Sequence, residues 1–258
     1  MTDSSMPGAR RFFRGPARAL LVLVLGLVLL VVGFLFYANM VLRGEREFAI
    51  KAWTNPAVSI TSTDHSIVMT PTGDDAATGL VFIPGAKVDP YAYLYKLSGI
   101  VEASGVTVVI TKPTLNLAFF DTRPLTTFTA DAPGVDRWFV GGHSLGGVRS
   151  CMLADDPDVG ANVAGLVLFG SYCANDLSAT DLEVLSIGGS EDGLSTPQKI
   201  ADAAPLLPST ATFVEIAGLN HAGFGNYGVQ SGDGVATISS TDARDEITAA
   251  LADFLAVR

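Results

Sequence analysis

The chain has 258 residues, of which 48% are apolar and 16% are charged, and its formal net charge is −10. This length and composition allow a full hydrophobic core, so we expect one globular domain outside any membrane segment. The charge is uneven: residues 1–51 carry seven Lys or Arg against three Asp or Glu, whereas residues 52–258 carry nine against 23. The acidic part would repel phosphate backbones, which argues against nucleic acid as a partner.

The first feature along the chain is an uncharged run of 24 residues, 19–42, rich in leucine, valine and phenylalanine. At about 1.5 Å per helical residue, such a run can cross a hydrocarbon core of roughly 30 Å. A secretory signal peptide is the alternative, but its apolar region is only about 7–15 residues long and ends at a small-residue cleavage site. Here Phe36-Tyr37-Ala38 places a large aromatic residue at the exit. The run therefore predicts a single transmembrane signal anchor.

Flanking charges give this helix an orientation. Arg10, Arg11, Arg14 and Arg18 precede the run, and a smaller set follows it: Arg43, Arg46 and Lys51. The excess of positive charge on the cytoplasmic side predicts that the Arg-rich tail, residues 1–18, lies in the cytoplasm. The domain after the helix would then be extracytoplasmic, attached to the cell membrane by one span. The Arg10-Arg11 pair also resembles a twin-arginine export signal, but the rest of that signal is missing.

Beyond the helix, residues 43–56 are expected to form a juxtamembrane spacer and residues 57–258 the folded domain. Short β-branched and aromatic runs alternate there with helical stretches, which favours an α/β fold with a mostly parallel sheet flanked by helices. The first two strands are candidates for antiparallel pairing. The expected strands are residues 58–61, 66–70, 80–83, 106–111, 137–141, 165–169, 183–187 and 211–216, and the last helix spans about 242–257.

Asp89-Pro90 marks a helix start, with Asp89 as N-cap and Pro90 in the first helical position. Tyr91, Tyr93 and Tyr95 lie on this helix, and we interpret them as packing residues rather than site residues.

The sequence Gly142-His143-Ser144-Leu145-Gly146 follows an expected strand and precedes an expected helix. In such a strand-to-helix turn a serine adopts a strained backbone conformation that exposes its Oγ, and the two glycines let strand and helix approach closely. We therefore predict that Ser144 is a nucleophile.

A serine nucleophile needs a base and an acid, and only three histidines are present. His65 lies in an early strand candidate, and the side chain of His143 is expected to point away from Ser144. His221 follows a strand, at the sheet edge where catalytic groups collect in α/β proteins, and is the predicted general base. The predicted acid is Asp192, in the loop after strand 183–187, with Glu191 as the runner-up.

The order Ser144, Asp192, His221 is that of the α/β-hydrolases, and residues 57–258 resemble this family. The resemblance rests on the serine turn, on Gly193-Leu194 after the acid, and on residues 220–225 and 80–85. It implies an α/β-hydrolase fold in which the backbone N–H of Leu145 forms half of an oxyanion hole. The other half would come from Ala86, with Lys87 as the alternative, in a loop that has Pro84-Gly85 where many relatives have His-Gly.

Cys151 and Cys173 are the only cysteines. In an oxidising compartment they could form a disulfide; otherwise they are two small buried residues. No Cys/His cluster has zinc spacing, and no phosphate loop or dinucleotide fingerprint is present, so we expect no metal and no cofactor.

The interval between the strands ending near residue 169 and beginning near residue 183 is too short for a lid. An open site favours accessible acyl esters, with Leu117, Phe119, Phe120 and Phe224 either as pocket walls or as core residues. The predicted function is a membrane-anchored serine hydrolase that cleaves carboxylic esters or thioesters. The alternatives are an acyltransferase with the same triad and a non-catalytic binding module of the same fold. The sequence does not specify an oligomeric state.

Overall fold

The computed structural model describes residues 14–156 and 163–255, and the chain divides into two units, Met1–Met40 and Val41–Arg258. In the first unit, helix α1 (Arg14–Ala38) contains the 22-residue segment Ala17–Ala38, which is long and apolar enough to cross a membrane. A signal sequence near an N-terminus meets the same criterion. The expected apolar helix is therefore present, and it ends before residue 42. The predicted tail arginines Arg10 and Arg11 lie outside the described residues.

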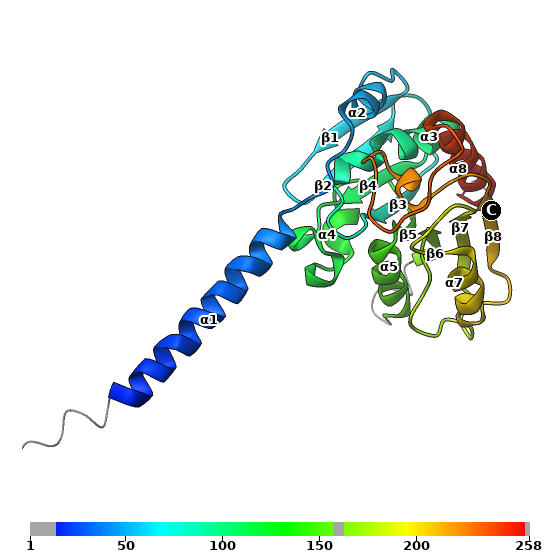
Figure 1. Ribbon diagram of the computed structural model, residues 1–258. Helices are drawn as coiled ribbons and strands as arrows, with labels where there is room; N and C mark the ends of the chain where they lie inside the picture. Colours follow the sequence, from blue (N-terminus) through cyan, green and yellow to red (C-terminus); the bar gives the residue numbers. More distant parts are fainter. Residues whose placement is uncertain (1–13, 157–162, 256–258) are drawn as a thin grey trace, which may run out of the picture. The chain divides into compact units, whose positions relative to one another are not determined.

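The second unit is built on one eight-stranded sheet with the strand order β1-β2-β4-β3-β5-β6-β7-β8 (Figure 1). Strands β1 and β2 pair antiparallel, and β2 also runs antiparallel to β4, whereas every pair from β4 to β8 is parallel. The fold expectation is thus confirmed, including the antiparallel start. The strands are β1 (Val58–Ser62), β2 (Ser66–Pro71), β3 (Thr78–Ile83), β4 (Thr107–Thr111), β5 (Arg137–His143), β6 (Val163–Phe169), β7 (Glu183–Gly189) and β8 (Thr212–Ile216).

The central strands of the sheet are buried on both faces, as their apolar runs require. Successive side chains of a strand point to opposite faces. In β3, Leu80 and Phe82 therefore join one core cluster, while Val81 and Ile83 join the other. The first cluster contains apolar side chains of α3 (Leu94–Ser104) and α8 (Ser240–Leu255), and the second contains those of α5 (Leu145–Asp155) and α4 (Thr126–Thr129). The sheet thus lies between two helical layers.

The remaining helices are short. A 3-10 turn, η1 (Pro90–Tyr93), leads into α3, and the Asp89 side chain accepts a hydrogen bond from the Tyr91 N–H at 3.0 Å, as its N-cap position predicts. The others are α2 (Arg46–Trp53), η2 (Thr114–Asn116), η3 (Ala118–Phe120), α7 (Pro197–Ala203), η4 (Ala204–Leu206) and η5 (His221–Phe224).

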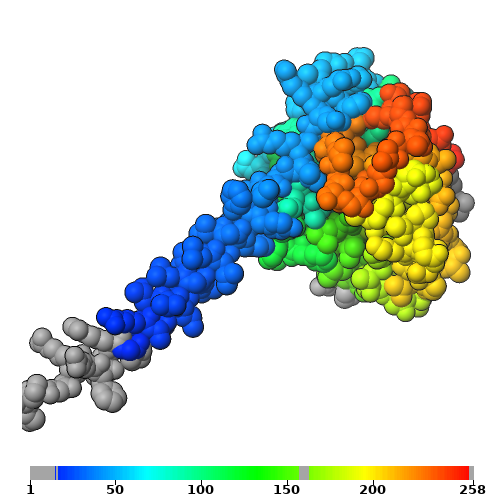
Figure 2. Space-filling view, viewed as in Figure 1, coloured from blue at the N-terminus to red at the C-terminus, as the bar shows by residue number. Residues whose placement is uncertain are grey.

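Residues 43–56, expected to form a spacer, belong to the folded unit. The Leu42 N–H donates to the Lys87 carbonyl at 2.7 Å, and the Leu42 carbonyl accepts from the Asp89 N–H at 2.9 Å. A further bond joins the Glu45 N–H to the Asn226 carbonyl at 2.7 Å, so the segments around residues 45 and 226 lie side by side (Figure 2). Because backbone bonds and the packing of α2 hold this segment, the compact unit begins at Val41 rather than near residue 57.

Candidate active site

The predicted serine turn has the expected geometry. Strand β5 ends at His143, α5 begins at Leu145, and Ser144 between them has φ 52° and ψ −121°. A positive φ at a non-glycine residue costs about 1–3 kcal/mol and persists only where the surrounding structure enforces it. A Cβ added at Gly146 would lie 2.0 Å from the Ile83 carbonyl oxygen, which explains why glycine is needed there. The turn therefore presents the Ser144 side chain at the carboxyl end of a central strand.

His221 and Asp192 meet in the interior of the protein. The distance from His221 Nδ1 to Asp192 Oδ2 is 2.8 Å, and the two residues are 1% and 3% exposed. The other carboxylate oxygen of Asp192 accepts backbone N–H groups from Leu194 at 2.8 Å and Ser195 at 2.7 Å. Glu191, the runner-up, is exposed, and its side chain accepts from Ser190 Oγ instead. Asp192 is thus the carboxylate that contacts this histidine.

The second ring nitrogen of His221, Nε2, takes no part in the contact with Asp192. Within the described part of the chain, buried Nε2 has no hydrogen-bond partner, so it is not bonded to Ser144 Oγ. Such bonds are often long until a substrate binds. The ring of His221 lies beside that of His143, with centroids 4.4 Å apart, which brings the candidate base next to the residue that precedes Ser144.

A fourth side chain, Asp233, supports the loops that carry this pair. Its Oδ1 accepts from the N–H groups of Gly193 at 3.1 Å and His221 at 3.0 Å, and its Oδ2 accepts from Ala222 at 2.8 Å. One carboxylate therefore joins the loop after β7 to the loop after β8. Sequence reasoning missed Asp233, because it lies in a Gly/Ser-containing loop without a recognisable motif.

The two expected oxyanion donors lie at neighbouring strand ends. Strands β3 and β5 pair in parallel with Ile83 opposite Gly142, so the loop after β3 adjoins the serine turn. Leu145 is the first residue of α5, and an N–H in that position has no acceptor within its own helix. The Lys87 N–H donates to Asn116 at 2.8 Å, whereas the Ala86 N–H has no partner among the described residues. Ala86 is therefore the better candidate of the two.

His143 is a second residue whose role the sequence did not indicate. It is 1% exposed, and burial, followed by the charge that His221 can carry, holds its pKa well below the usual value. Its Nδ1 lies 2.9 Å from the hydroxyl of Tyr93, which also accepts the Gly85 N–H at 2.9 Å. Tyr93 thus contacts both the loop after β3 and the residue that precedes Ser144.

The aromatic residues suggested as pocket walls divide into two groups. Phe224 is fully buried, with its ring centroid 5.6 Å from that of Phe169, and is a core residue. Phe119 and Phe120 are each 48% exposed and lie in η3, directly after η2. The last residue of η2, Asn116, accepts a hydrogen bond from the Lys87 N–H in the loop after β3. These two aromatic side chains remain candidates for contact with a substrate.

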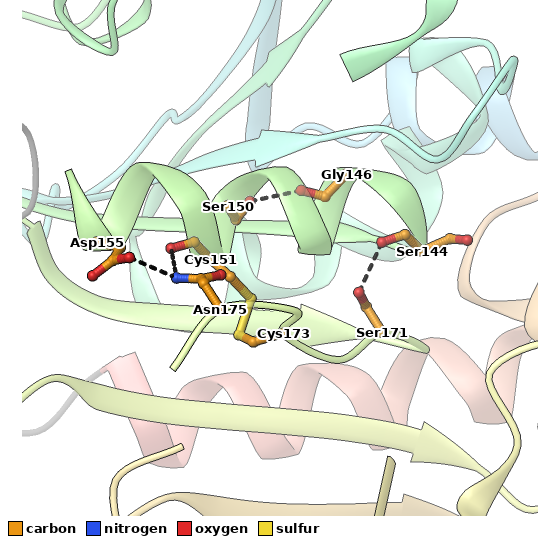
Figure 3. Close-up of a disulfide and its surroundings, with 8 residues drawn as sticks. All are labelled: Ser144, Gly146, Ser150, Cys151, Asp155, Ser171, Cys173 and Asn175. Atoms are coloured by element: carbon orange, nitrogen blue, oxygen red, sulfur yellow. Dashed lines mark hydrogen bonds between the residues drawn. A yellow bond between two sulfur atoms is a disulfide. The ribbon is translucent and has the colours of Figure 1, made fainter. Parts of the chain in front are cut away.

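Cys151 and Cys173 form a disulfide with a Cα–Cα distance of 5.6 Å. It joins α5 to the segment after β6, and Figure 3 shows it on the same side of α5 as Ser171. The Ser171 hydroxyl donates to the carbonyl of Ser144 at 2.7 Å. A Cβ added at Gly147 would lie 2.4 Å from the Ser171 Oγ, so α5 and this segment are in close contact. The bridge therefore lies two residues from a group that holds the backbone of the candidate nucleophile.

Among the residues that the structure describes, no group of three His, Cys, Asp or Glu side chains could hold a metal ion. The candidate site therefore rests on the residues described above: Ser144, the His221–Asp192 pair and the expected backbone donors.

Solved structures of low sequence identity share this fold. An esterase from Pyrobaculum calidifontis is 16% identical, with a TM-score of 0.59 over 86% of this chain and 91% of that one. The thermophilic carboxylesterase EstE1, cloned from a metagenomic library, is 15% identical, with a TM-score of 0.56 over 82% and 95% of the two chains. An alpha-beta serine hydrolase homologue from Coxiella burnetii is 14% identical, with a TM-score of 0.52 over 77% and 98%.

No curated protein matches the sequence closely enough to serve as a relative. The sequence profile of the alpha/beta hydrolase family, in contrast, matches residues 79–245, which include all of β3 but its first residue, the serine turn and both loops that carry the histidine-carboxylate pair. This match covers well over half of the chain. The protein therefore belongs to the alpha/beta hydrolase family.

Proposed function

We propose that the protein is a serine hydrolase that cleaves carboxylic esters or thioesters. The observation that carries the proposal is the strained Ser144 at the start of α5, combined with a buried His221–Asp192 pair whose Nε2 is unpaired within the described residues. A strained backbone and a buried ionisable pair both cost stability, and such costs are concentrated at functional sites. Structural neighbours described as esterases support the choice of reaction class.

In the proposed mechanism, Ser144 Oγ attacks the acyl carbonyl as Nε2 of His221 takes the hydroxyl proton. Asp192 accepts the hydrogen bond from Nδ1–H and stabilises the imidazolium that forms. The carbonyl oxygen becomes an oxyanion and accepts hydrogen bonds from the N–H groups of Leu145 and Ala86. Collapse expels the alcohol or thiol, which takes the proton from Nε2 and leaves Ser144 acylated. Water, deprotonated by the same nitrogen, then releases the acid and restores the serine.

We also propose that α1 anchors the protein as a single membrane span with the catalytic domain outside the cytoplasm. The length and apolar character of the helix support a span, and the arginines before it favour a cytoplasmic N-terminus. The Cys151–Cys173 disulfide supports the same side, because disulfides persist in oxidising compartments and are rare in the cytosol. In this proposal the helix stays attached to the protein, whereas an exported soluble enzyme would lose it by cleavage.

The test of the reaction is fluorophosphonate labelling of the full-length protein, with mass spectrometry of the modified peptide and assays of ester turnover. Ser144→Ala removes the nucleophile and little volume, so labelling and turnover should both disappear while the fold remains. Turnover that survives in this variant would contradict the proposal. Assays with added alcohols separate hydrolysis from acyl transfer, because a transferase would form a new ester in preference to the free acid.

The test of the anchor is fractionation followed by protease protection. Full-length protein should stay with the membranes after a carbonate wash, and protease added outside spheroplasts should digest the acidic domain but spare the N-terminal tail. A soluble mature form that begins just after the apolar helix would show that the segment is a cleaved signal sequence.

A further inference from the structure

Tyr93 contacts two elements of the candidate site that come from different strands. It is fully buried on η1, and its hydroxyl oxygen lies 2.9 Å from the Gly85 nitrogen and 2.9 Å from His143 Nδ1. Gly85 belongs to the loop after β3, which carries the candidate oxyanion donor Ala86. His143 is the last residue of β5 and directly precedes Ser144. One hydroxyl thus connects the oxyanion loop to the residue beside the nucleophile.

The direction of these two bonds follows from the groups involved. The Gly85 N–H can only donate, so the Tyr93 oxygen accepts it. The tyrosine has a single O–H, and donating it to Nδ1 satisfies both partners. The proton of the neutral His143 ring is then on Nε2. Because both bonds are buried, losing the hydroxyl would leave the Gly85 N–H and the His143 Nδ1 without a partner, which carries a desolvation penalty.

The same hydroxyl helps to aim the Ala86 N–H. A peptide unit is planar, so the Ala86 N–H points away from the Gly85 carbonyl with which it shares a plane. That carbonyl accepts the Val88 N–H at 3.1 Å, and the Gly85 N–H is fixed by Tyr93. Hydrogen bonds therefore fix both the N–H and the carbonyl group of Gly85. A Cβ added at Gly85 would lie 2.9 Å from His143 Nδ1, so the loop already lies close against this ring.

We propose that Tyr93 is a positioning residue that aligns the oxyanion loop with the serine turn, an inference that rests on the proposed function. It does not touch the substrate. It acts by fixing Gly85 relative to His143, and thereby the Ala86 N–H relative to Ser144. An oxyanion donor must already point at the developing charge, since a donor that has to reorient during the reaction contributes less stabilisation.

The test is Tyr93→Phe in the full-length protein, because this change removes one oxygen and keeps the ring that packs against Phe82. Loss of a complete oxyanion donor costs about 10²–10³ in kcat, and a misaligned donor should cost less, about tenfold or more. We expect kcat to fall by that amount while KM changes less than about twofold. Fluorophosphonate labelling should slow in parallel, because phosphonylation builds up the same negative oxygen.

The chain offers matched controls. Tyr95 and Tyr91 lie in the same segment, and their hydroxyls bond Thr241 Oγ1 at 3.2 Å and Ser62 Oγ at 3.1 Å. Tyr95→Phe and Tyr91→Phe remove equivalent atoms outside the site and should leave kcat unchanged. A kcat for Tyr93→Phe within twofold of the wild type, or a loss confined to KM, would overturn the proposal. Rates are normalised to the fraction of molecules that a fluorophosphonate titrates.

A second pair of variants tests the other end of the bond if Tyr93→Phe folds poorly. In His143→Asn the amide oxygen can occupy the position of Nδ1 and accept the tyrosine O–H, whereas His143→Leu cannot. We expect the asparagine variant to retain most of kcat and the leucine variant to lose it; equal losses would refute the link. Turnover retained in Ser144→Ala would refute the proposed function itself, while serine labelling with an unaffected Tyr93→Phe would refute only the positioning role.

Discussion

Removing the disulfide should lower the free energy of unfolding of the folded domain, by an amount set by the length of the loop that the disulfide closes. Cys151 and Cys173 are 22 positions apart, and closing a loop of that size in the unfolded chain corresponds to about 3 kcal/mol at 25 °C. For a domain of this length, that difference corresponds to a fall in Tm of roughly 6–12 °C. The stabilisation should exist only in the oxidised protein.

The assay is urea unfolding of the full-length protein in detergent, followed by tryptophan fluorescence, with and without reductant. Both cysteines are at most 2% exposed, so Cys151→Ala/Cys173→Ala is the matched variant and avoids burying a new hydroxyl. The variant should resemble the reduced wild type and should not respond to reductant. Two alkylated thiols in the denatured, unreduced wild type, or a loss of stability below about 1 kcal/mol on reduction, would refute the reasoning.

Activity should respond to reduction less than stability does. The bridge lies two residues from Ser171, whose hydroxyl holds the Ser144 carbonyl, but neither that bond nor the packing of Gly147 involves a sulfur atom, so we expect both to survive the loss of the disulfide. At temperatures well below the new Tm, ester turnover should therefore remain within about twofold of the oxidised protein, since the local contacts still enforce the strained serine backbone. A proportionate loss of kcat would show that the covalent bridge itself fixes the serine turn.

Three further predictions concern the acid, the loop that carries the histidine, and a buried lysine. Asp192→Asn should reduce kcat severely and Glu191→Gln hardly at all, because only the Asp192 carboxylate contacts the histidine. If steady-state kinetics showed the larger loss for Glu191→Gln, the acid would be misassigned. Asp233→Ala should lower kcat/KM about ten- to hundredfold by releasing the histidine loop, whereas the exposed Asp242→Asn is a neutral control. Burial, then the charge of a neighbouring arginine, lowers the pKa of Lys96 from 10.5 to about 7. Between those two pH values the lysine is protonated in the unfolded chain and neutral in the folded protein. The free energy of unfolding should therefore rise with pH, by up to about 1.4 kcal/mol per pH unit. Urea unfolding measured from pH 7 to 9 should show this rise in the wild type and a smaller rise in Lys96→Met.

The sheet could be predicted because its signals are local. Each strand is a short β-branched or aromatic run, and all eight expected strands are present with ends that shift by two residues at most. The serine turn could be predicted as well, because a serine flanked by two glycines at a strand-to-helix junction has a steric explanation: the glycines allow the strand and the helix to approach closely. The pairing of Asp192 with His221 could be anticipated from their places at the carboxyl ends of β7 and β8, which are neighbours in the sheet.

Tyr93 and Asp233 could not be found in this way, because their importance depends on backbone groups far away in the chain. Tyr93 has the same sequence signal as Tyr91 and Tyr95, and only the fold shows that its hydroxyl meets a residue 50 positions later. Asp233 resembles any acidic loop residue, yet its partner Gly193 lies 40 positions earlier. Contacts to backbone N–H groups leave no pattern of side-chain types in the sequence.

The segment after the apolar helix illustrates a different limit. The uncharged run extends to residue 42, and apolarity alone does not distinguish side chains that face lipid from side chains that pack on a protein. In the structure α1 ends at Ala38, and Leu42 forms an isolated bridge with Val88. The two Leu42 hydrogen bonds reach Lys87 and Asp89, in the loop that also carries Ala86. The segment that follows the proposed anchor therefore also helps to hold the loop of the proposed oxyanion hole. Variants that shorten the connection should therefore keep residues 41–45, since a boundary at residue 57 would remove these bonds along with α2.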